Sequence, residues 1–165
     1  MEIITKELGN VIEIEENLQV WKMPKKMGED FKQLIEYLEE NNLEITAPYA
    51  RYIDLDWEEE ASNVFFTKLS NFFVKKWHFK AGLVVSEKLN PKNPIKQDFI
   101  GKCKYLKKIH KGAYSKVGKT YKEMLLWAKS NNISLANESI EFYLNDPREV
   151  KKTELETMVL IRMKK

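Results

Sequence analysis

A single carboxylate in an otherwise apolar strand is the strongest candidate for chemistry in this sequence. Glu141 lies in the segment ESIEFYLND, and the two-residue period of a strand places it on the same face as Ser139 and Tyr143. The opposite face, which we expect to pack against helices and the core, consists of Ile140, Phe142 and Leu144. A carboxylate in a pocket can hold a cation where its partners offset the cost of desolvation. The alternative is an ordinary, exposed strand glutamate.

Aromatic side chains near strand ends and turns could complete a cation site. Ring faces attract positive charge, by roughly 0.5–2 kcal/mol each, although aromatic residues also simply fill cores. Tyr114 follows Gly112 at a turn into a helix, where its phenol could stack on a ligand, donate to Glu141 or only pack in the turn. The expected ligand-binding residues are Glu141, Tyr143, Tyr114, Trp77, Tyr52 and Trp57. The aromatic residues expected in the core instead are Trp21, Tyr37 and Trp127.

The same group of residues could perform hydrolysis. We assign no catalytic residue from the sequence, and the serine-hydrolase pattern Gly-x-Ser-x-Gly is absent. In an enzyme, Glu141 would position or activate water, and Tyr114 or Tyr143 would act as the acid or as an orienting donor.

The sequence gives no support for a metal or a cofactor. His78 and His110 are the only histidines, and they lack the spacing with other ligands that a metal site needs. Cys103 is the only cysteine, so we expect no disulfide and a packing role in a strand. Nucleotide-binding loops of the Gly-x-Gly-x-x-Gly and Walker types are absent, and we predict no cofactor.

An internal repeat organises these residues. Met27–Asp56 and Val117–Asp146 align without a gap at a constant offset of 90 positions. The identical pairs are Gly28/Gly118, Lys32/Lys122, Asn41/Asn131, Asn42/Asn132 and Asp56/Asp146. The repeat places Arg51 at the position that matches Glu141. A pair between these two side chains would compete with a cationic ligand, and the repeat alone leaves that alternative open.

Each repeat predicts a β-α-β-β unit. Apolar residues at helical spacing predict helices over about 29–40 and from Val117 to Ala128, each ending at an Asn-Asn pair. The predicted strands are Val11–Ile14, Leu18–Met23, Ile45–Leu55, Trp77–Ser86, Tyr105–His110, Ser139–Leu144 and Met158–Met163. We expect an α+β fold in which the tandem units form one antiparallel sheet, with both helices on one face and the other face lining a central ligand cleft.

The first unit carries an inserted segment that the second lacks. Glu58–Lys75 predicts an extra, phenylalanine-rich helix that is either a lid over the cleft or part of the core. Asn90–Pro94 is expected to be a linker within a single domain, 1–165, whose pseudo-repeats cover about 1–90 and 96–165.

The second half resembles the GyrI-like small-molecule-binding domain, which is also the effector-binding domain of AraC-type and multidrug-sensing activators. The segments that carry the resemblance are His110–Tyr114, Tyr121–Trp127, Glu141–Pro147 and Leu155–Ile161. Two departures are Gly112-Ala113-Tyr114, where the family often has Gly-Pro-Tyr, and the phenylalanine-rich insertion. The resemblance implies a central pocket for lipophilic, often cationic, aromatic compounds, with a buried glutamate at Glu141. It also implies an alternative, because some standalone members are associated with hydrolysis of reactive cyclopropanoid compounds.

Charge and hydropathy bound the remaining expectations. Residues 1–60 carry a net charge of −10 and residues 61–165 carry +13, with eight lysines and no acid between Lys102 and Lys122. We interpret the lysines as a solvated surface and expect no specific nucleic-acid binding, since no helix-turn-helix pattern precedes the first unit. No signal peptide and no membrane span are apparent. We therefore expect a standalone, cytoplasmic binding protein for hydrophobic, cationic aromatic molecules, with no membrane partner and a monomer favoured.

Overall fold

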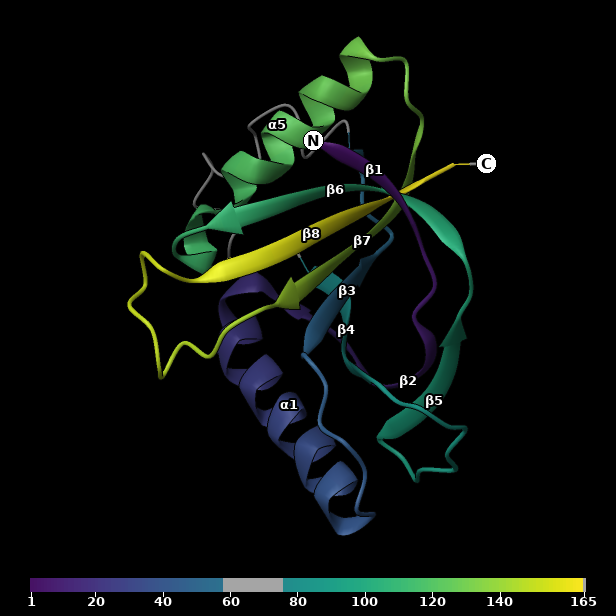
Figure 1. Cartoon of the computed structure of the whole chain (residues 1–165). Coiled ribbons are helices and arrows are strands. Elements are labelled where there is room, and N and C mark those ends of the chain that lie inside the picture. The colour runs from purple at the N-terminus through teal and green to yellow at the C-terminus, as the bar shows by residue number, and fades with distance from the viewer. Residues whose placement is uncertain (58–75, 165) are drawn as a thin grey trace.

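The chain folds into one antiparallel sheet with helices packed on it (Figure 1). A computed structural model describes residues 1–57 and 76–164. The strands are β1 (Glu2–Lys6), β2 (Gly9–Gln19), β3 (Tyr49–Ile53), β4 (Lys76–Val84), β5 (Ile95–Ile100), β6 (Cys103–Lys111), β7 (Leu135–Tyr143) and β8 (Glu156–Met163). The helices are α1 (Met23–Glu40) and α5 (Val117–Ser130), each preceded by a short 3-10 turn, Val20–Lys22 or Tyr114–Lys116. The predicted α+β class is confirmed, while the predicted helix over Glu58–Lys75 lies outside the described residues.

The strand order has an internal symmetry. The sheet runs β1-β6-β8-β7-β3-β4-β2-β5, so that β7 and β3 meet at its centre. Ala50 pairs with Glu141 and Arg51 pairs with Ile140 in these two strands. The central strands of both units therefore lie next to one another beneath the space between the helices.

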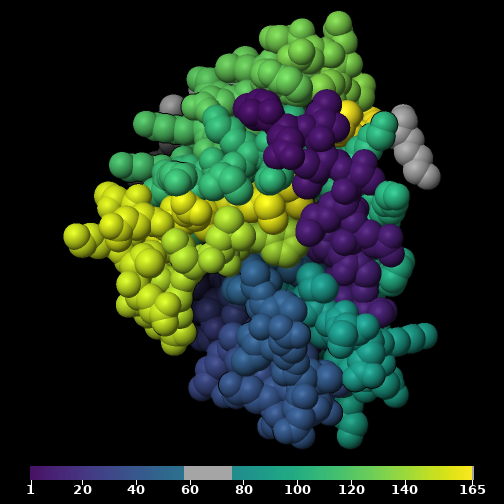
Figure 2. Space-filling view, in the orientation of Figure 1, coloured from purple at the N-terminus to yellow at the C-terminus, as the bar shows by residue number. Residues whose placement is uncertain are grey.

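Two strands, β1 and β5, were not predicted from the sequence. β1 pairs with β6 of the second unit and β5 pairs with β2 of the first, so the units exchange their first strands. Figure 2 shows the purple N-terminal segment lying against the second half of the chain. Only Glu7 and Leu8 separate β1 from β2, although these strands pair near opposite ends of the sheet. The sheet must curl until its ends approach one another, and the Leu8 amide donates to the Ile100 carbonyl at 3.1 Å.

Both helices bury an apolar stripe on the same face of the sheet. Leu34 and Leu38 of α1 pack in a cluster with Ala81 and Leu83 of β4. On α5, the equivalent stripe packs against β6 and β8 and consists of Met124, Leu125 and Ala128. The predicted strand over Leu18–Met23 is wrong, because β2 ends at Gln19 and Pro24 lies in the first turn of α1, where its fixed φ suits a helix start. Among residues 1–57 and 76–164, we find no helix with the length and apolar character needed to cross a bilayer.

The face without helices is filled rather than hollow, which corrects the predicted position of the cleft. The curled sheet encloses a core cluster there, formed by Leu8, Val11, Tyr49, Ile100, Tyr105, Ile140, Phe142 and Leu160. Strand alternation grouped Ile140 with Phe142 correctly, but these residues point away from the helices. Leu144 lies beyond the end of β7 and is 43% exposed, and Trp21 is 49% exposed. The prediction that these two side chains belong to the core is therefore wrong.

Candidate ligand-binding pocket

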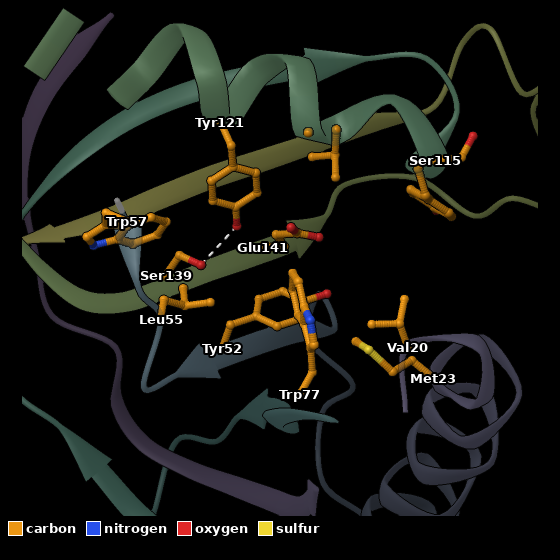
Figure 3. Close-up of a pocket in the computed structure, with 13 residues that line it drawn as sticks. Val20, Met23, Tyr52, Leu55, Trp57, Trp77, Ser115, Tyr121, Ser139 and Glu141 are labelled. Atoms are coloured by element: carbon orange, nitrogen blue, oxygen red, sulfur yellow. Dashed lines mark hydrogen bonds between the residues drawn. The ribbon is translucent and has the colours of Figure 1, made fainter. Parts of the chain in front are cut away.

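A pocket of about 170 Å³ lies on the helix-bearing face, between the N-terminal ends of α1 and α5 (Figure 3). Its floor is formed by the central strands β3 and β7, and its sides by the turns that lead into the two helices. The lining residues are Val20, Met23, Tyr52, Leu55, Trp57, Trp77, Tyr114, Ser115, Val117, Gly118, Tyr121, Ser139 and Glu141. The pocket is thus an aromatic and apolar space with one carboxylate in its floor.

Glu141 is almost completely buried, with 6% of its surface exposed. Desolvation raises the pKa of its carboxyl group from 4.5 to about 7, against the opposing effect of hydrogen bonds from the tyrosine hydroxyls of Tyr121, Tyr143 and Tyr52. The Tyr143 hydroxyl lies 3.4 Å from Oε2 of Glu141. In the described part of the chain, no lysine, arginine or histidine forms an ion pair with Glu141. The carboxylate is held by hydroxyl dipoles and lacks a resident counter-charge there.

The aromatic rings of the pocket brace one another. Tyr52 meets Trp77 edge to face with centroids 5.4 Å apart, and Trp57 stacks on Tyr121 at 6.2 Å. The Trp57 indole also donates to the carbonyl of Ala136 at 2.6 Å, which fixes its orientation. Edge and stacked contacts of this kind favour fixed ring positions. The rings therefore present preformed faces to the pocket.

The structure brings the predicted site residues together. Tyr52, Trp57, Trp77, Tyr114 and Glu141 all line the pocket, although they come from four separate parts of the chain. Tyr143 lies behind this lining, where its hydroxyl reaches Glu141 and its ring meets Tyr114 at 5.3 Å and Phe31 at 5.9 Å. Tyr114 therefore contacts the ring of Tyr143. One of the sequence-based alternatives was a hydrogen bond from Tyr114 to Glu141, and the structure does not show it.

Arg51 lies on the opposite face of the sheet from Glu141, which excludes the pair that the repeat left open. Its guanidinium binds Glu13 through two hydrogen bonds, at 2.9 and 2.6 Å, and reaches Asp98 at 2.8 Å. The reason is the register, since Arg51 is paired with Ile140 and Ala50 is the partner of Glu141. Side chains of paired residues share a face, so Arg51 lies on the Ile140 face.

Tyr121 and Ser139 are site residues whose roles the sequence did not predict. The Tyr121 hydroxyl lies 2.9 Å from Oγ of Ser139, as seen in Figure 3. Tyr121 was hidden in the apolar stripe of α5, where its ring fits the helical spacing. The signal that could have identified Tyr121 was its hydroxyl, because a buried phenol needs a polar partner. Phe31, at the equivalent position of the first repeat, has no hydroxyl and needs no such partner.

The histidines lie outside the pocket. His110 is buried, with Nδ1 2.9 Å from Thr120 Oγ1 and Nε2 3.2 Å from the Ala113 carbonyl. His78 lies between Glu15 and Asp54 on the face without helices. Within residues 1–57 and 76–164, no group of three or more histidine, cysteine or acidic side chains has the arrangement of a metal site. The polar groups that the described residues bring to the pocket are the carboxyl group of Glu141, phenols, indoles and the hydroxyls of Ser115 and Ser139.

Comparison with known proteins gives one family and several solved structures that share the fold. The sequence model of the GyrI-like small molecule binding domain matches residues 31–164. A search of curated proteins finds no significant match.

Solved structures resemble the whole chain at low sequence identity. The C-terminal domain of EcmrR superposes with a TM-score of 0.69 and 17% identity, covering 99% of this chain and 98% of that one. EcmrR in its DNA complex superposes with a TM-score of 0.76 and 17% identity, and this chain spans 57% of the length of EcmrR. SAV2435, solved with tetraphenylphosphonium, superposes with a TM-score of 0.58 and 12% identity, covering 99% of this chain and 94% of that one. A protein from Listeria innocua described as a hydrolase superposes with a TM-score of 0.61 and 10% identity, covering 99% of this chain and 92% of that one. These likenesses establish a shared fold.

Proposed function

We propose, since this chain belongs to the GyrI-like small-molecule-binding domain family, that its pocket binds a hydrophobic aromatic cation and that Glu141 is the counter-charge. The stacking surfaces in this proposal are Tyr52, Trp57, Trp77 and Tyr114, with Tyr143 holding Glu141 in place. The protein would then sequester or sense such molecules in the cytoplasm.

One observation carries the proposal, namely a buried carboxylate, Glu141, that lies beneath a set of aromatic faces and has no ion-pair partner among residues 1–57 and 76–164. An isolated buried charge is costly, and for Glu141 this cost appears as a raised pKa, because no ion pair with a described residue offsets it. A ligand cation would supply the missing charge, and ring faces would stabilise it further. The tetraphenylphosphonium complex of SAV2435 supports this ligand class for a protein of the same fold.

The test is the variant Glu141→Gln, which keeps the shape of the side chain and removes its charge. Titration with a cationic dye and with a neutral dye of similar shape, read by fluorescence, separates charge from packing. We expect the affinity for the cationic dye to fall by roughly 30-fold or more, because a buried cation would lose its partner. The affinity for the neutral dye should change little. Equal affinities of both proteins for both dyes would contradict the proposal.

A second candidate function is hydrolysis of strained or electrophilic small molecules in the same pocket. It is favoured by a carboxyl group with a pKa of about 7, which suits a general base at neutral pH, and by the phenol of Tyr143 beside it. Glu141 would activate water, with Tyr143 or Tyr114 as the donor. The Listeria innocua neighbour described as a hydrolase supports this candidate. Product formation that Glu141→Gln abolishes would establish it, and absence of product from a panel of epoxides and cyclopropanes would argue for binding alone.

A further inference from the structure

The outer edge of β1 has the properties of an interaction surface. β1 lies at one end of the sheet and pairs with β6, and among residues 1–57 and 76–164 its other edge has no strand partner. Figure 2 shows the purple N-terminal segment, which contains β1, on the surface of the molecule. Glu2, Ile3 and Thr5 are exposed, and Ile3 leaves 48% of its surface accessible. The N–H and C=O groups along such an edge are a template on which another strand can pair.

The edge strand at the other end of the sheet, β5, is blunted by its own side chains. The Phe99 amide donates to Oδ1 of Asp98 at 2.8 Å, and Arg51 holds the other oxygen of this carboxylate at 2.8 Å. Charged side chains are a usual means of blunting an edge. In the described part of the chain, no side chain bonds to the backbone of β1 in this way, and Glu2 binds the side chain of Lys107 instead. β1 is therefore the edge on which a further strand can pair.

The sequence of β1, EIITK, is complementary to itself in the antiparallel direction. When two copies pair about Ile4, Glu2 of each copy lies opposite Lys6 of the other, at both ends of the pairing. Residues opposite one another share a face and have Cβ atoms about 4.5–5.5 Å apart, so that opposite charges attract. Ile3 lies opposite Thr5, and both are β-branched residues that suit a strand. A shift of this register by two positions in either direction would separate the charges.

We infer that β1 is a self-association surface, on which β1 of a second copy of this chain pairs antiparallel about Ile4. The dimer is twofold symmetric and joins the two sheets edge to edge. Ile3 and Thr5 share the helix-bearing face, since Ile3 pairs with Leu106, which packs against α5. The helices of both copies therefore lie on the same side of the joined sheet.

The inferred interface is separate from the pocket. The pocket floor is formed by β3 and β7 in the middle of the sheet, whereas β1 lies at its end. Self-association through β1 thus does not depend on the proposed function. It departs from the monomer that the sequence favoured.

Sedimentation equilibrium of the full chain, between about 1 μM and about 1 mM, tests for the dimer. We expect the wild type to show a concentration-dependent equilibrium between monomer and dimer. Glu2→Lys sets like charges opposite one another at both ends of the pairing, and Lys6→Glu does the same with the other sign. Each variant should dimerise at least about tenfold more weakly than wild type.

A mixture of the two variants separates pairing across the interface from contacts within the chain. Glu2 binds Lys107 at 3.0 Å and Lys6 Nζ lies 5.8 Å from the centre of the Phe142 ring, so each variant also loses a contact within its own chain. Mixing does not restore those contacts, but a heterodimer of the two variants has opposite charges at both ends. We expect the equal mixture to dimerise nearly as well as wild type.

The control is Glu44→Lys, which makes the same change of charge at an exposed position between α1 and β3. It should dimerise as wild type does. A wild type that stays monomeric over the whole concentration range would overturn the inference. Equal weakening by Glu44→Lys would overturn it too, because net charge would then be the cause. Dimers that neither β1 variant weakens, or a mixture that stays as weak as its components, would show that the antiparallel pairing of β1 is wrong.

Discussion

At the scale of single residues, the state of Glu141 links pH to stability. Burial raises the pKa of this carboxyl group to about 7 in the folded protein, against about 4.5 when unfolded. Between these values the folded state holds a proton that the unfolded state has released. The free energy of unfolding therefore falls as pH rises through this window, and the loss is complete above pH 7. The difference in pKa corresponds to about 3 kcal/mol.

Glu141→Gln isolates this effect, because glutamine does not titrate and the other ionisable groups stay the same. We expect the free energy of unfolding of the variant, taken relative to wild type, to be about 2.5 kcal/mol higher at pH 8 than at pH 5, measured by urea denaturation. The buried carboxylate would then be a site whose charge lowers stability and serves binding instead. A stability difference that is the same at both pH values would show that Glu141 is not desolvated.

Residue chemistry was only partly readable from the sequence. The alternation of β7 placed Glu141 with Ser139 and Tyr143, because that depends on the two-residue period alone. The face of the sheet on which Arg51 lies could not be predicted, because it depends on the register between β3 and β7. A shift of that register by one position moves the side chain to the other face. The ungapped alignment of the repeats matches Arg51 with Glu141, but in the structure Glu141 pairs with Ala50, so these two matched residues lie on opposite faces of the sheet.

At the scale of elements, Gly82 fixes how β3 and β4 meet. Gly82 pairs with Tyr49, and a Cβ added at Gly82 would lie 2.4 Å from Cζ of that ring. Tyr49 is fully buried and its hydroxyl donates to Glu13 at 2.9 Å, so the ring has no room to move. We expect Gly82→Ala to lower the free energy of unfolding by about 1–3 kcal/mol, measured by urea denaturation.

The matched control is Gly28→Ala in α1. An added Cβ there meets nothing within 4 Å, and alanine suits a helix interior better than glycine. This substitution should leave stability unchanged or raise it by up to about 1 kcal/mol. Equal destabilisation by both substitutions would mean that the Tyr49 contact is not the cause at Gly82.

The elements that the sequence predicted are those with strong periodic patterns, and the missed ones are short edge strands. α1, α5 and the central strands carry long apolar patterns that few other structures explain. β1 reads EIITK and β5 reads IKQDFI, with charges interspersed, because an edge strand has one neighbour and partly faces solvent. Their pairing with the opposite unit is a long-range property that no local pattern contains.

At the scale of the whole molecule, the exchange of first strands makes the two halves depend on each other. Residues 96–165 alone would keep nearly all of β5 and the whole of β6, α5, β7 and β8. They would lose β1 beside β6, β3 beside β7 and β2, which is the partner of β5. The core on the face without helices would also be split, since Leu8, Val11 and Tyr49 come from the first half.

We therefore expect residues 96–165 expressed alone to aggregate or to remain loosely folded, because three strands would expose unpaired edges and part of a shared core would be missing. Size-exclusion chromatography and thermal unfolding followed by circular dichroism would measure this. The full chain, by contrast, should unfold in one cooperative transition. Adding residues 1–95 to the fragment should restore a cooperative transition, because that piece supplies β1, β2 and β3. A sharp thermal transition from monomeric residues 96–165 alone would show that the exchanged strands are dispensable and that each half is a folding unit by itself.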